Sequence, residues 1–182
     1  KTNMLILNYA KNFYVIGLLG HIQELTLKTL SATFLTSSNL AFFSQGEASA
    51  KLLNRIPDSL FVIIYPRISK LSKEDSSEIA IRSFKIILLI VALIGILLTL
   101  IAKPLIIFLY GQEFGPSATV IQIAVPGLVI LASCMPFVAY FEGIGKANLV
   151  PKLQLIPIFF QALIGYFMIN KYGLDGASLT LS

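Results

Sequence analysis

Residues 86–102, IILLIVALIGILLTLIA, decide the fold class of this chain. The run holds seventeen consecutive residues without a charged side chain, and a helix needs about 20 mainly apolar residues to cross a bilayer. Charged residues make up 13% of the 182-residue chain, whereas soluble domains contain about 25%. The composition therefore predicts a membrane protein whose segments are helices.

Working outward from this run, apolar segments separated by polar turns predict an all-α, polytopic transmembrane helix bundle. Five segments are long enough to be complete transmembrane helices, and the chain stops just after a sixth has begun. They cover residues 10–35, 41–68, 83–102, 116–141, 149–169 and 174–182. We expect Pro104 to end the third helix. Residues 104–110 should then form an interfacial or re-entrant piece, and the charged stretch 66–82 is long enough for a short surface helix. Because the chain starts and stops within apolar patterns, we expect it to be part of a longer protein.

The basic residues test this segment order independently. Nine of the 14 lysines and arginines lie at alternate connections and their flanks, and two lie at the other connections. The nine are Lys1, Lys11, Arg67, Lys70, Lys73, Arg82, Lys85, Lys146 and Lys152, and the two are Lys103 and Lys171. The positive-inside rule then predicts that the loops at 67–82 and 142–152 are cytoplasmic.

The second segment contains the stretch 47–70, EASAKLLNRIPDSLFVIIYPRISK, whose charges lie on one side of a helix. Successive residues turn by about 100°, which places Glu47, Lys51, Arg55 and Asp58 within one arc. Ionised groups at membrane depth usually face a bundle interior or a water-filled cavity, so this face is one candidate cavity wall. In the other interpretation Lys51 extends to the headgroups, and Arg55 pairs with Asp58 three residues later. Pro57 should kink this helix.

The first segment carries a second polar stripe that could face the first. Its members recur at helical spacing and are Gly17, His21, Glu24, Lys28 and Ser31. The alternative is a local pair between Glu24 and Lys28, four residues apart, which only makes the helix easier to insert. His21 is either an interhelical hydrogen-bonding residue or part of a transport site.

Several function classes are excluded by what the sequence lacks. The single cysteine, Cys134, rules out a disulfide within the chain, and the single histidine cannot build a zinc site alone. Sequence patterns of nucleotide-binding loops, zinc proteases and serine hydrolases are absent. Residues 143–146, Gly-Ile-Gly-Lys, are best explained as a helix-capping turn. We therefore expect no enzyme, no cofactor, no metal site and no nucleic-acid partner.

Four stretches together resemble one family of membrane exporters. They are AFFSQGEASAKLLNRIPDSLFVIIYPRISKL (41–71), LYGQEFGPSATVIQIAVPGL (109–128), FEGIGKANLVPKLQLI (141–156) and KYGLDGASLTLS (171–182). In order and spacing they resemble the polysaccharide flippases of the multidrug/oligosaccharidyl-lipid/polysaccharide (MOP, MATE-like) superfamily, of the Wzx type that exports O-antigen. Ala41 stands where the family usually has glycine, and Glu24 is offset from the family's usual aspartate.

This resemblance implies a bundle related to helices 7–11 and the start of helix 12 of such exporters. The implied function is flipping of a polyprenyl-pyrophosphate-linked oligosaccharide by alternating access in a bacterial or archaeal cytoplasmic membrane. The implied partners are membrane lipids, an N-terminal lobe outside this chain and the polysaccharide polymerase machinery. On this view Lys28, Lys51 and Arg55 would bind pyrophosphate, while Glu24, Asp58 and His21 would support them or couple to protons.

The prolines would let such a bundle bend. Pro57, Pro126, Pro136 and Pro157 all lie inside apolar segments, and broken helices are common in transporters. Two other functions stay open at this point. One is a drug or organic-cation antiporter of the same fold, whose cavity should be net acidic. The other is a non-transporting membrane protein of polysaccharide assembly.

Overall fold

The protein is seen here in a computed structural model that describes the backbone of residues 2–182 and the side chains of residue 11 and residues 14–182. Lys1, counted above among the basic residues, lies outside the described residues. Within the described part every regular element is helical, which confirms the all-α prediction. The elements are α1 (Thr2–Phe34), α2 (Ser37–Ala50), a 3-10 turn η1 (Lys51–Asn54), α3 (Arg55–Ile68), α4 (Lys73–Tyr110), η2 (Gln112–Phe114), α5 (Ser117–Ser133), α6 (Met135–Gly143), α7 (Leu149–Tyr172) and α8 (Leu174–Leu181).

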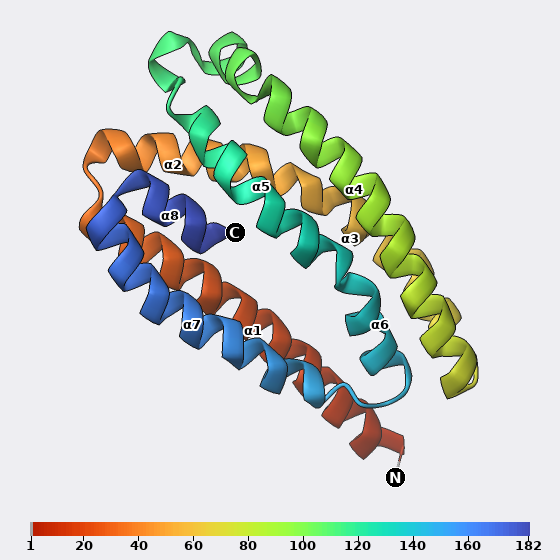
Figure 1. The fold of residues 1–182 in the computed structure, drawn as a ribbon. Helices are drawn as coiled ribbons and strands as arrows, with labels where there is room; N and C mark the ends of the chain where they lie inside the picture. The colour runs from red at the N-terminus through yellow and green to blue at the C-terminus, as the bar shows by residue number, and fades with distance from the viewer. Residues whose placement is uncertain (1) are drawn as a thin grey trace.

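The helices run back and forth along one direction (Figure 1). In Figure 1, α1, α4 and α7 run one way, whereas α2–α3, α5–α6 and α8 return the other way. The start of the chain, the α3–α4 turn and the α6–α7 turn therefore gather at one end of the molecule. The α1–α2, α4–α5 and α7–α8 connections gather at the opposite end.

Helix α5 is the centre of the packing. It contacts α4, α2 and α8, and Val120, Ile121 and Ala124 on it are fully buried. Glycines let two neighbours approach closely: a Cβ on Gly46 of α2 would lie 2.5 Å from the Val120 Cβ, and one on Gly95 of α4 would lie 2.8 Å from Val129 Cγ2. Small residues at crossings are the usual means of packing membrane helices, because backbones can then make close van der Waals contact.

Helices α1 and α7 pack side by side as a separate pair, and α8 connects that pair to α5. Gly165 of α7 lies against Thr180 of α8 and Leu30 of α1. The Phe34 and Tyr166 rings meet edge to face, with centroids 5.4 Å apart. The molecule therefore consists of an α1–α7 pair and an α2–α6 group, with α8 between them.

Three parts of the described chain are long and apolar enough to span a membrane: Lys73–Tyr110, Ser117–Gly143 and Leu149–Tyr172. We compared the 18-residue apolar stretch of each part. In the second part 50% of that stretch is buried within the protein, against 17% in the first and 11% in the third. Helices α4 and α7 therefore present most of their apolar surface outward. The segments at 10–35 and 41–68 are helical but more polar or broken, so their crossing of the membrane stays a prediction.

Two expected helix ends differ from the structure. Pro104 does not stop a helix, since α4 continues through it to Tyr110 and ends at Gly111, whose φ is 91°. Proline removes one hydrogen bond, and membrane helices tolerate that loss. Residues 104–110 are accordingly part of α4. Residues 73–82 of the predicted surface helix are also part of α4, which begins at Lys73. There the Ser72 Oγ accepts a hydrogen bond from the Asp75 N–H at 3.2 Å.

The second and fourth segments are interrupted where single helices were expected. The α2–α3 segment breaks at the 3-10 turn 51–54, and Pro57 is the third residue of α3. There its missing N–H removes no bond internal to α3, because the first turn of a helix has no partners for its N–H groups. The α5–α6 segment breaks at Cys134, with Pro136 in the first turn of α6.

Candidate functional site

Four charged side chains from α1, α2 and η1 form one connected cluster, which we call the ion cluster: Glu24, Lys28, Glu47 and Lys51. Lys28 Nζ donates to Glu24 Oε1 at 2.8 Å within α1. Lys51 Nζ lies 2.6 Å from Glu47 Oε1 and 3.6 Å from Glu24 Oε1. Lys51 is therefore shared between a carboxylate of its own segment and a carboxylate of α1.

Local sequence and helix packing contribute differently to this arrangement. The Glu24–Lys28 and Glu47–Lys51 pairs are each four residues apart, which brings their side chains to the same face of a helix. The Glu24–Lys51 pair joins two segments and exists only because α1 lies beside the α2–η1 junction. Lys51 is the first residue of η1, so the Glu24–Lys51 ion pair lies where the α2–α3 segment is interrupted.

Burial in the cluster increases from Lys28 to Glu47. The side chains are 54% exposed for Lys28, 40% for Glu24 and 35% for Lys51, but only 7% for Glu47. A buried carboxylate is strongly destabilising unless a cation stays beside it. Glu47 therefore holds Lys51 in place, while Lys28 and Glu24 stay accessible to a solute.

The cluster is electrically balanced. Two carboxylates face two ammonium groups, so the cations at Lys28 and Lys51 already have anionic partners. An anionic ligand at this site would have to compete with Glu24 and Glu47 for the two ammonium groups. The resemblance implied that Lys28 and Lys51 bind pyrophosphate with Glu24 in support, and that role stays a prediction.

The other predicted site residues lie outside the cluster. Arg55 and Asp58 are both exposed on the first turn of α3. In the described part of the chain no ion pair joins them, so the local pair that one interpretation expected is not formed. His21 is exposed on α1, one turn before Glu24, and Ser31 is fully buried farther along the same helix.

The two interrupted segments meet at their prolines. Pro57 and Pro136 are fully buried, and both line one small apolar contact region between α3, α4 and α6. Pro126 and Pro157 are exposed and lie inside α5 and α7, which continue past them. The sequence marked these prolines as candidate bending points but did not show that Pro57 and Pro136 line the same contact region.

Comparison with known proteins agrees with these features. The sequence profile of the polysaccharide biosynthesis protein family matches residues 2–119, which include the whole ion cluster. The capsular polysaccharide biosynthesis protein CapF of Staphylococcus aureus is 26% identical over 129 residues, covering 69% of this chain and 33% of CapF. The chain thus spans about a third of the length of that relative. No solved structure matches the chain.

The family match covers well over half of the chain and includes α1 through the start of α5. The matched residues include the apolar helix α4 and the whole ion cluster. The chain belongs to the polysaccharide biosynthesis protein family.

Proposed function

We propose that the protein carrying this chain is a flippase that moves polyprenyl-pyrophosphate-linked oligosaccharide across the membrane. Family membership supports a role in polysaccharide biosynthesis, and the helices supply a membrane-embedded scaffold. The observation that carries the proposal is the sharing of Lys51 between Glu24 of α1 and Glu47 of α2. A transport site needs charges that can exchange partners, and this cluster offers them beside a helix break.

The chemistry of the cluster suits a pyrophosphate headgroup. When a phosphate oxygen approaches, Lys28 and Lys51 can leave Glu24 and form new charge-assisted pairs with the ligand. The exposed guanidinium of Arg55, one turn after Lys51, would add bidentate contacts to phosphate. Glu24 would then be released from its cations and could take up a proton, with Asp58 and His21 as further supporting groups. Ligand binding would thereby weaken the connection between α1 and η1.

Alternating access requires the helices to move relative to one another, and the two breaks support such a motion. Pro57 and Pro136 pack together between α3, α4 and α6, so a bend in one segment would change the contacts of the other. Interrupted helices of this kind surround substrate sites in secondary transporters. We infer that the α1–η1 ion pair and the paired breaks change together during transport.

The alternating helix directions support a definite orientation in the cytoplasmic membrane. The α3–α4 and α6–α7 turns lie at the same end of the molecule (Figure 1). These turns and their flanks carry seven of the 14 lysines and arginines, against two at the other connections, so we place the loops at 67–82 and 142–152 in the cytoplasm. The remaining length of the protein would supply the facing half of the transport path, and the polymerase of the polysaccharide would be a downstream partner.

The test uses the complete protein that carries this chain, expressed in bacteria whose own capsular exporter is deleted. We expect it to restore surface polysaccharide, and Lys51→Ala and Arg55→Ala variants at equal abundance to accumulate lipid-linked precursor on the cytoplasmic side. Lys171→Ala is the matched control, because Lys171 lies outside the ion cluster, in the last turn of α7, with its Nζ 5.2 Å from the centroid of the Tyr172 ring. Normal export by both the Lys51→Ala and the Arg55→Ala variants would contradict the proposed site. Failure of the unmutated protein together with increased drug resistance would favour an antiporter instead.

A further inference from the structure

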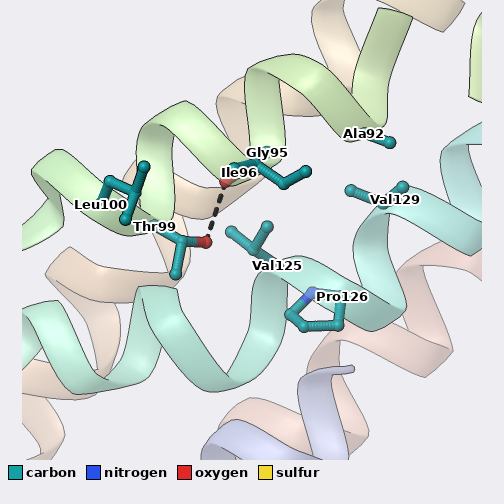
Figure 2. A pocket seen from close by; sticks show the side chains of 8 residues that line it. All are labelled: Ala92, Gly95, Ile96, Thr99, Leu100, Val125, Pro126 and Val129. Carbon is teal, nitrogen blue, oxygen red and sulfur yellow. Dashed lines mark hydrogen bonds between the residues drawn. The ribbon is translucent and has the colours of Figure 1, made fainter. Parts of the chain in front are cut away.

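Two hollows lie along the contact between α4 and α5, and we call them together the α4–α5 groove. Its inner part is an apolar hollow of about 320 Å³. Figure 2 shows side chains from both helices around it, with Gly95 and Val125 close to the helix contact. The lining residues are Ala92, Gly95, Ile96, Thr99, Leu100, Val125, Pro126 and Val129.

The outer part of the groove is a second hollow of about 650 Å³ at the α4–α5 connection. It differs in chemistry, because its lining includes one ammonium group, two side-chain amides and a hydroxyl. These belong to Lys103, Gln112, Gln122 and Thr119. Within the described part of the chain Lys103 forms no ion pair.

Helical periodicity places the linings of the two hollows along one stripe of each helix, which is why we treat them as one groove. On α4 the lining residues 92, 96, 99, 103 and 107 recur every three or four positions, so they form one stripe. Residues 118, 122, 125 and 129 do the same on α5. Gln122 Nε2 donates to the Thr99 carbonyl oxygen at 3.4 Å at the boundary between the two hollows.

The length of the groove suits one leaflet of a bilayer. Ala92 and Lys103 are eleven residues apart on α4, which corresponds to about 16 Å along a helix. The hydrocarbon core of a bilayer is about 30 Å thick, so the apolar hollow reaches roughly to its middle. Exposed apolar residues beside it, including Leu93 and Leu97, indicate that this side of α4 faces hydrocarbon.

We propose that the α4–α5 groove binds an anionic phospholipid of the surrounding bilayer. The phosphate would lie on the Lys103 ammonium and the amide donors of Gln112 and Gln122, and one acyl chain would fill the apolar hollow. Basic pockets between membrane helices are known to bind the headgroups of anionic lipids. The groove is separate from the ion cluster, so the lipid would act as a structural ligand of the α4–α5 pair.

Native mass spectrometry of the complete protein in detergent tests the proposal, with phosphatidylglycerol as the probe and phosphatidylcholine for comparison. We expect phosphatidylglycerol to bind more tightly, and Lys103→Ala to raise its dissociation constant about five-fold, the effect of one basic residue at a lipid surface. Ala92→Phe should weaken both lipids, because the ring would occupy the acyl-chain hollow. Circular dichroism checks that each variant keeps its helical content.

Two matched variants separate the groove from general effects. Lys171→Ala removes a lysine from the same end of the molecule, and Leu93→Phe adds a ring on α4 outside the groove; neither should change phosphatidylglycerol binding. The proposal is overturned if Lys103→Ala and Lys171→Ala behave alike, or if phosphatidylcholine binds as tightly. It is also overturned if a polyprenyl phosphate binds to the groove and phosphatidylglycerol does not, which would make the site one for the carrier lipid.

Discussion

Replacing Lys51 by methionine removes the ammonium that connects Glu47 and Glu24 while keeping a chain of similar length. Glu47 would then be left 7% exposed without the cation that lies 2.6 Å from its Oε1. Glu24 would keep its bond to Lys28. The main effect of Lys51→Met is therefore an uncompensated buried carboxylate next to the interrupted part of the helix.

The cost follows from the burial of the pair. Removing one partner of a fully buried ion pair destabilises a protein by about 3–5 kcal/mol. Lys51 itself is 35% exposed, and solvent screening weakens such a pair, so we expect a decrease of about 1–3 kcal/mol in the free energy of unfolding. The corresponding variant of the exposed pair, Lys28→Met, should cost less than about 0.5 kcal/mol.

The assay is unfolding by sodium dodecyl sulfate in mixed micelles, followed by circular dichroism, for Lys51→Met, Glu47→Gln and the double variant. Because Glu47→Gln removes the buried charge, the double variant should be more stable than the sum of the two single effects predicts. We expect a coupling energy of at least about 1 kcal/mol, within the range for residues in contact. Additive effects, or equal losses for Lys51→Met and Lys28→Met, would refute the reasoning.

Two further predictions concern packing and orientation. Gly95→Val should destabilise the protein by about 1–3 kcal/mol in the same assay, because a Cβ there would lie 2.8 Å from a methyl group of α5. The control Gly17→Ala should be neutral or stabilising, because nothing lies within 4 Å of a Cβ at that position. Equal losses of stability for the two variants would contradict the packing. In a cysteine-free background, single cysteines replacing Lys70 and Lys146 should react with an impermeant maleimide only from the cytoplasmic side, and one replacing Lys171 only from the opposite side. Labelling of all three from one side would overturn the orientation.

Local sequence was sufficient for much of the helical architecture. The uncharged run 86–102 and the spacing of polar turns predicted an all-α chain, and the structure is all-α in the described residues. The Glu24–Lys28 pair was also predictable, because a four-residue spacing brings two side chains together on any helix. The helix boundaries were less predictable: Pro104 was expected to end a helix, but α4 continues through it.

The candidate site depended on contacts between segments. The periodicity of residues 47–58 showed that charges shared one face, but it did not identify their partners. Packing of α1 beside the α2–η1 junction placed Glu24 within 3.6 Å of Lys51. The same packing left Arg55 and Asp58 exposed and unpaired with each other. The shared and electrically balanced cluster therefore depended on how the segments pack.

Sequence alone determined that this is an all-α protein with membrane helices, since hydrocarbon demands long apolar runs whose backbone bonds are satisfied within each helix. The tertiary structure alone decided three features: the burial of Glu47, the contact between the breaks at Pro57 and Pro136, and the groove between α4 and α5. The physical reason is that these features depend on how helices distant in sequence pack. That packing is set by small residues such as Gly46 and Gly95 at their crossings.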